Sequence, residues 1–272
     1  MTTTAGVADL IGAFYRDVHN GRNPDRAADY LAAGYRSHHP AADGSLDGFR
    51  RTRTALLGDF PDLDARVDHL LVQNDRAMVF AHWTGTHRDH GPLRMGTADL
   101  YRVSGDRITE HWGVVDYSAL LRMGMPVTDQ ARQPGEPPDW RCGRAEREAL
   151  RLVIRVWEEV MTQHRLELTE RYYRQDYIQH NEYAARSGAG LAGMKQFFAG
   201  LFQLAPDFSS QIKQLVVDGD KVGLFATWRG REASSGRELA LATADVLRIE
   251  DGLIAEHWDV MDFAAVAKFG VG

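Results

Sequence analysis

The chain of 272 residues has only one cysteine, Cys142, so it cannot form an internal disulfide and nothing requires an oxidising compartment. It lacks a run of roughly 20 apolar residues, the length that a membrane-spanning helix needs. Its first residues also lack the basic and apolar segments of a signal peptide. We therefore expect a cytoplasmic protein that does not associate with membranes.

Positive charge is also scarce, because 32 Lys and Arg residues stand against 38 Asp and Glu residues and give a formal charge of -6. Nucleic-acid binding needs clustered positive charge, so we expect no nucleic-acid partner. The sequence has no glycine-rich phosphate-binding loop either, and we expect no cofactor.

What the sequence does contain is one long internal repeat. Ile108–Asp116 matches Ile254–Asp262, and Thr97–Val103 matches Thr243–Ile249, both at an offset of 146 residues. Trp-x-Gly, Pro-Asp and Tyr-x-x-His blocks recur in the same order further upstream. A period of this length indicates a duplicated domain rather than a solenoid repeat.

The repeat predicts two domains, 1–124 and 144–272, joined by an extended linker, 125–143, that is rich in proline. In each copy, apolar residues first recur at helical spacing and then alternate with a period of two. In copy one this predicts helices over 7–18, 24–30 and 49–60, followed by strands over 63–72, 77–87, 93–103 and 107–115. Helices followed by an antiparallel meander predict an α+β fold.

These blocks resemble the SnoaL-like polyketide cyclase family of the nuclear-transport-factor-2-like superfamily. The resemblance rests on Tyr-x-x-His from Tyr35 and Tyr177, on Trp-x-Gly, and on the Ile-x-Glu-His-Trp strand of each copy. It implies two cone-shaped α+β barrel domains, each with N-terminal helices packed on a curved antiparallel sheet around a small-molecule pocket. It also implies pairing through the sheets, so we expect an intramolecular pseudo-dimer, with further homo-oligomers left open.

The resemblance also points to candidate catalytic residues. The family's cyclases have an essential aspartate on the last strand, three residues after the acidic residue of the motif. That position is Asp259 in copy two and Gly113 in copy one. On the preceding strand, where those cyclases have a histidine, this chain has Asp245 and Asp99. Strand alternation puts His257 on the face of Asp259, beside the cross-strand Asp245.

We predict that Asp245, His257 and Asp259 form a catalytic group. Asp259 would remove a proton next to a carbonyl, and His257 would polarise or reprotonate the oxygen. A structural network between two strands is the alternative. Copy one offers Asp99 and His111 without the third acid, either as a dyad or as a structural remnant.

Further residues are candidates for substrate binding at the pocket mouths and on the strands. They are Tyr35, His38, His39 and Trp83 in copy one and Tyr177, His180, Asn181 and Trp228 in copy two, with Glu182 and Tyr183 beside them. The cluster His82, His87, Asp89 and His90 matches no metal-ligand spacing, and we predict no metal site. Arg102 and Arg248 are expected to pair with Glu110 and Glu256 on the adjacent strand.

The leading functional prediction is a cofactor-independent acid–base enzyme acting on a hydrophobic, carbonyl-containing small molecule. Polyketide cyclisation or isomerisation in secondary metabolism is the expected setting. An epoxide-hydrolase-like activity is one alternative, but it needs Asp–Arg–Asp around a water, and no arginine is clearly on the pocket face. A non-catalytic binding module is the other, since one fold supports many chemistries.

Overall fold

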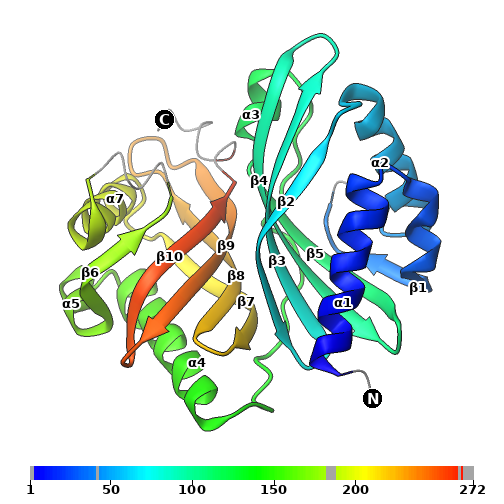
Figure 1. The fold of residues 1–272 in the computed structure, drawn as a ribbon. Helices are drawn as coiled ribbons and strands as arrows, with labels where there is room; N and C mark the ends of the chain where they lie inside the picture. The colour runs from blue at the N-terminus through cyan, green and yellow to red at the C-terminus, as the bar shows by residue number, and fades with distance from the viewer. Residues whose placement is uncertain (1–2, 41–42, 182–187, 263–264, 266–272) are drawn as a thin grey trace. The chain divides into compact units, whose positions relative to one another are not determined.

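The computed structural model describes residues 3–40, 43–181, 188–262 and 265. The chain divides into two compact units, with the division along the chain between Pro134 and Gly135. Each unit contains one copy of the repeat, and the five strands and the long helices follow in the same order in both (Figure 1). The predicted tandem arrangement is therefore confirmed, whereas the predicted domain limits at residues 124 and 144 stay predictions.

The first domain begins with a helix whose N-cap is Thr3, the side chain of which accepts a hydrogen bond from Gly6 N–H. This helix continues directly into a π-helical turn, and Pro24 then opens a short 3-10 helix. In chain order the elements are α1 (Thr4–Phe14), η1 (Tyr15–Asn20), η2 (Pro24–Asp29), β1 (Leu31–Ser37), α2 (Leu46–Asp59), β2 (Asp64–Gln73), β3 (Arg76–His87), β4 (Gly91–Ser104), β5 (Arg107–Val115) and α3 (Ser118–Arg122).

The second domain has the same strand order and the same π-helical turn, with one more short helix before its first strand. Gly143 precedes its first helix, and the Glu146 carboxylate accepts a hydrogen bond from Gly143 N–H. The elements are α4 (Arg144–Val156), η3 (Trp157–Thr162), η4 (Leu166–Leu168), α5 (Thr169–Tyr172), β6 (Tyr173–Gln179), α7 (Gly190–Leu204), β7 (Ser209–Asp218), β8 (Lys221–Arg231), β9 (Glu238–Glu250) and β10 (Leu253–Met261).

Each domain has one five-stranded sheet, in the order β1-β5-β4-β3-β2 or β6-β10-β9-β8-β7. The predicted α+β fold is confirmed, but the sheets are open and mixed, since β1 and β6 pair in parallel with β5 and β10. Tyr35 and Tyr177 lie outside the predicted strands, and the structure places both on these parallel edge strands instead. The reason is that the first and fifth residues of each strand are its buried ones, a pattern without the period of two.

Helices pack on one face of each sheet, and the space between them forms the hydrophobic interior of the domain. Val7, Ile11 and Phe14 of α1 are fully buried, and α1 packs against β2 and β3. In the second domain, Val153 and Val156 of α4 are equally buried, and α4 packs against β7 and β8. Each such side chain contributes about 1.5–3 kcal/mol through burial, so the interior is well defined and can hold polar groups in place.

Part of the predicted linker packs against β5 where β1 has ended. Gln130 donates to Val115 C=O and accepts from Val115 N–H, both at 2.8 Å. Gln133 does the same with Gly113, at 2.5 and 3.0 Å. Two side-chain amides thus take the place of a strand partner. No helix in the described parts of the chain is both long and apolar enough to cross a membrane.

Candidate active sites

A histidine–aspartate pair lies at the centre of each domain. His111 Nε2 is 2.8 Å from Asp99 Oδ1, and His257 Nε2 is 2.8 Å from Asp245 Oδ1. The sheet registers pair Asp99 with Gly113 and Asp245 with Asp259, so each imidazole reaches its carboxylate diagonally from two residues earlier. Because an ionised carboxylate only accepts, we assign the hydrogen to Nε2 of each ring.

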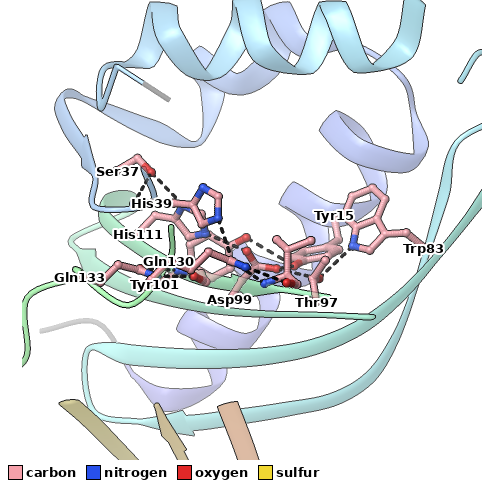
Figure 2. Close-up of polar contacts among 12 residues, drawn as sticks. Tyr15, Ser37, His39, Trp83, Thr97, Asp99, Tyr101, His111, Gln130 and Gln133 are labelled. Carbon is pink, nitrogen blue, oxygen red and sulfur yellow. Dashed lines mark hydrogen bonds and ion pairs between the residues drawn. The ribbon is translucent and has the colours of Figure 1, made fainter. Parts of the chain in front are cut away.

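In the first domain, the pair faces the helices. Trp83 Nε1 donates to Thr97 Oγ1 at 2.9 Å, and this hydroxyl donates to Asp99 Oδ2 at 3.1 Å. Tyr15, which opens η1, donates to the same carboxylate oxygen at 2.9 Å. Figure 2 shows these contacts running from Ser37 and His39 through His111 and Asp99 to Tyr15 and Trp83. Because Tyr15 of η1 belongs to this network, the His111 imidazole points toward the helices, into the domain interior.

The second domain repeats the relay with the same residue types. Trp228 Nε1 donates to Thr243 Oγ1 at 3.1 Å, and Thr243 donates to Asp245 Oδ2 at 3.0 Å. The Trp228 ring stacks on Phe198 of α7, with 5.8 Å between ring centroids. His257 therefore also lies on the helix-facing side of its sheet.

Two carboxylates approach the imidazole of His257. Asp259 Oδ2 lies 4.0 Å from Nε2, in addition to Asp245 on the same nitrogen, and Asn181 Nδ2 donates to Asp259 Oδ1. Tyr177 OH and Gln179 Nε2 lie 3.1 and 3.0 Å from Nδ1. Burial alone would lower the pKa of His257, but the hydrogen bond and charge of Asp245 and the charge of Asp259 raise it above its usual value. The two carboxylates thus favour a hydrogen on Nε2, while Nδ1 accepts from the Gln179 amide.

The first domain has no side chain where Asp259 stands. A Cβ on Gly113 would lie 3.3 Å from each of Asp99 Oδ1, His111 Nε2 and His39 Cδ2. The Asp99 and His111 side chains are each 15% exposed, against 7% for Asp245 and 5% for His257. Solvent therefore reaches the first pair more easily.

The carboxylate of Asp99 stays ionised although it is buried. Burial raises its pKa, but hydrogen bonds from His111, Tyr15 and Thr97 more than compensate and hold the pKa below its usual range. All these donors point at one group, so Asp99 orients the His111 ring and is itself held in place.

The candidate binding residues separate into two groups. Tyr35, His39, Trp83, Tyr177, Asn181 and Trp228 lie at or beside the two networks. His39 Nε2 is 3.3 Å from Gln130 Oε1, and burial together with the charge of His111 lowers the His39 pKa to about 4. Glu182 and Tyr183 lie outside the described residues.

His38 and His180 belong to the other face of the sheets. Each contacts the glutamate next to the pocket histidine, with 2.8 Å from His38 Nε2 to Glu110 and from His180 Nε2 to Glu256. His180 also stacks on Trp258, with 4.4 Å between ring centroids. Alternation along the strand explains this, because residues adjacent to a pocket residue point away from the pocket.

The remaining predicted contacts have structural roles. Arg248 Nε lies 2.7 Å from Glu256 Oε1 and Arg102 3.5 Å from Glu110, which confirms the predicted cross-strand pairs. In the histidine-rich turn, His87 Nδ1 accepts from the backbone N–H groups of Asp89 and His90 at 3.0 and 3.2 Å, and so caps the turn.

Metal binding was not predicted, yet one group has suitable spacing. The candidate ligand atoms of Asp245, His257 and Asp259 lie within 4.8 Å of one another. With the hydrogen assigned to Nε2, this nitrogen would have to release it before coordinating a metal ion.

The sequence interpretation missed Arg53 of α2. Its guanidinium lies 4.7 Å from the centroid of the Trp83 ring and 5.8 Å from that of Phe49. Phe198 holds the corresponding place over Trp228 in the second domain. The signal was available, because Arg53 stands at helical spacing between Phe49 and Leu56, within the apolar stripe of its helix.

An Asp–Arg–Asp arrangement is divided between the domains. Among the described residues, the first domain combines Arg53 with Asp99 but has Gly113, and the second combines Asp245 with Asp259 but has Phe198. Neither pocket assembles the three groups that the epoxide-hydrolase alternative needs.

Comparison with known proteins gives one family. The model of the SnoaL-like polyketide cyclases matches residues 9–123 and again residues 151–268. Similar solved structures include TsrD from Streptomyces laurentii, at 25% identity over 47% of this chain and 96% of that chain, with a TM-score of 0.41. A candidate polyketide cyclase from Acidithiobacillus ferrooxidans is 23% identical over 45% of this chain and 96% of that chain, with a TM-score of 0.41. No curated protein matches the chain.

Proposed function

The chain belongs to the SnoaL-like polyketide cyclase family, and on that premise we propose that its second domain is an acid–base enzyme for a hydrophobic, carbonyl-containing small molecule. The reaction would remove a proton next to the carbonyl and return one, as an aldol-type cyclisation or an isomerisation requires. The observation that carries the proposal is the pair of carboxylates at His257, with Asp245 at 2.8 Å and Asp259 at 4.0 Å from Nε2.

The two carboxylates have different tasks in this proposal. Asp245 receives the His257 and Thr243 hydrogens and fixes the ring. Asp259 accepts from Asn181 and stands beside the ring, where it takes the proton from the substrate carbon. The electrons of that C–H bond move to the carbonyl oxygen, and His257 then gives this oxygen a proton. The raised pKa of His257 supports its role as the proton source.

The surroundings support a largely apolar substrate. Phe198 and Phe208 flank Trp228, with ring centroids 5.8 and 5.3 Å away. Tyr173 packs edge-on against Tyr177 at 5.1 Å. Aromatic side chains around a few convergent polar groups are typical of small-molecule sites.

We assign proton abstraction to the second domain because Gly113 removes the base from the first. A division of labour between the two copies follows from this assignment. Pairing of the domains as an intramolecular pseudo-dimer, with one pocket in each, remains a prediction from the repeat.

The test measures proton abstraction without knowledge of the natural substrate. The intact chain is incubated in D2O with 1-tetralone, an apolar aromatic ketone, and deuterium uptake next to the carbonyl is followed by NMR. We expect Asp259→Asn to reduce the protein-dependent rate by about 100-fold or more, since a positioned base contributes 10²–10⁴-fold. Glu256→Gln, on the same strand but the opposite face, is the matched control and should keep the rate.

Equal rates for the wild type and Asp259→Asn would exclude Asp259 as the base. A wild-type rate no faster than that of buffer would contradict the enzyme assignment and favour a binding module.

A further inference from the structure

The first domain holds a cation that no acidic side chain neutralises. α2 carries three nearby arginines, and two of them pair with acids: Arg50 with Asp47 and Arg51 with Asp43. Among the described residues, no hydrogen bond or ion pair joins the guanidinium of Arg53. It is half-buried and lies over Trp83 in the domain interior. A charge in such a place is costly unless a counter-ion reaches it.

Asp99 is the nearest candidate counter-ion, but its oxygens already have partners. Oδ1 accepts from His111, and Oδ2 accepts from Tyr15 and Thr97. Burial lowers the pKa of Arg53, and the negative charge of Asp99 offsets this only in part. Arginine nevertheless keeps its charge in proteins, so the positive charge of Arg53 is left for another anion.

The geometry around Arg53 suits a planar anion. The ring faces of Trp83 and Phe49 contact the guanidinium as cation–π partners and leave its N–H edges for hydrogen bonds. A guanidinium presents paired N–H groups that match the two oxygens of a carboxylate. Tyr101 lies nearby, and burial raises the Tyr101 pKa, so its phenol stays neutral, with its hydroxyl 3.4 Å from that of Tyr15.

The neighbouring rings offer apolar surface for the rest of the ligand. The His111–Asp99 pair on the adjoining strands is 15% exposed, against 5–7% for its counterpart. We propose that the first domain binds a small aromatic carboxylate, with Arg53 holding the carboxylate and Trp83, Phe49 and Tyr101 surrounding the apolar part. This site is distinct from Asp259 and does not rest on the proposed activity of the second domain.

The test compares an acid with its neutral analogue on the intact chain. Binding of 2-naphthoate and of 2-naphthamide is measured by calorimetry for the wild type and for Arg53→Phe, which installs the residue that the second domain has at this place. We expect the wild type to prefer the carboxylate by at least about tenfold, and Arg53→Phe to lose this preference, since a hydrogen bond between ionised groups contributes 1.5–3 kcal/mol. Arg53→Lys should keep part of it, because an ammonium retains charge but not the paired N–H geometry.

The exposed Arg51→Gln serves as the control and should bind as the wild type does. Hydrogen exchange of β4 and β5 checks that each variant is folded. If Arg53→Phe does not fold, Arg53→Lys provides the test. An unchanged preference in both Arg53 variants would overturn the proposal. Absence of 2-naphthoate binding to the wild type at about 5 mM would overturn it as well, because a Kd above about 5 mM corresponds to a binding free energy of less than about 3 kcal/mol.

Discussion

The two domains share one framework and differ in the charges placed on it. Both contain the relay from tryptophan through threonine and aspartate to histidine, with hydrogen bonds of 2.8 to 3.1 Å. They differ at two matched positions. Where the first domain has the cation Arg53, the second has the apolar Phe198. Where the first has Gly113, without a side chain, the second has the acid Asp259. The shared relay orients the imidazole in both domains, so the proposed difference in ligand and reaction depends on the other two positions.

A second difference concerns buried histidines. The first domain buries His19 and partly buries His39, and burial lowers the pKa of both, to about 4 for His39. The second domain has Met161 and Asn181 at the matching positions, and its pocket histidine has a raised pKa instead. The two domains should therefore respond oppositely to pH.

The largest expected effect tests whether the more buried histidine–aspartate pair contributes more to the stability of its domain. We expect Asp245→Asn to destabilise the second domain by about 3 kcal/mol and Asp99→Asn the first by about 1–2 kcal/mol, because breaking a buried charge pair costs more than breaking an exposed one. The Asp245 pair is 5–7% exposed and the Asp99 pair 15%. Hydrogen exchange of the intact chain, read on β9–β10 and β4–β5 separately, measures both. The exposed Asp106→Asn is the control, and a larger loss for Asp99→Asn would refute the argument.

The next effect is acid sensitivity of the first domain. A histidine with a folded-state pKa of about 4 binds its proton more tightly when unfolded, at a pKa near 6.5, so stability falls as the pH drops between these values. For His39 this amounts to about 2 kcal/mol at pH 5. His39→Asn, which copies Asn181, should remove this part of the loss from pH 7 to pH 5, as hydrogen exchange of β5 would show. The same acid loss in the variant as in the wild type would mean that His39 is not the responsible group.

Much of the fold was predictable because it depends on periodicity and on the repeat. The four long strands of each copy lie where the sequence predicted strands, although β3, β8 and β9 are buried almost continuously instead of in alternation. Their matched order identified the duplication. The short strands β1 and β6 were not predicted, since each has two buried residues among seven and so gives no alternating signal.

The candidate site was predictable where neighbours on a strand decide it. Asp245, His257 and Asp259 meet as the register and alternation predicted, whereas His38 and His180 turned to the opposite face. Arg53 was missed because it comes from a helix, and no local pattern says which strand a helix covers. Only the packing of α2 over Trp83 brings that cation to Asp99.

A smaller effect of opposite sign is expected in the second domain. The pKa of His257 is raised, so its proton is held more tightly in the folded state. The resulting stabilisation is complete below the unfolded pKa of about 6.5 and is lost as the pH rises through the folded pKa. Protection of β10 against hydrogen exchange should therefore fall between neutral and alkaline pH in the wild type. His257→Gln should show a flat profile, and an equally steep one would place the titrating group elsewhere.

The smallest expected effect concerns the outer face, where the two domains are most alike. Arg248 contacts both Glu256 at 2.7 Å and Glu250 at 3.2 Å, whereas Arg102 contacts Glu110 at 3.5 Å. Cross-strand charge pairs at partly exposed sites contribute about 0.2–1 kcal/mol, so we expect Arg248→Ala near the upper end and Arg102→Ala near the lower end. Because such pairs are screened by salt, the difference between the variants should shrink at high ionic strength. Hydrogen exchange of β4 and β9 at low and high salt measures this, and a difference that persists in high salt would assign it to packing on the strand instead of to charge.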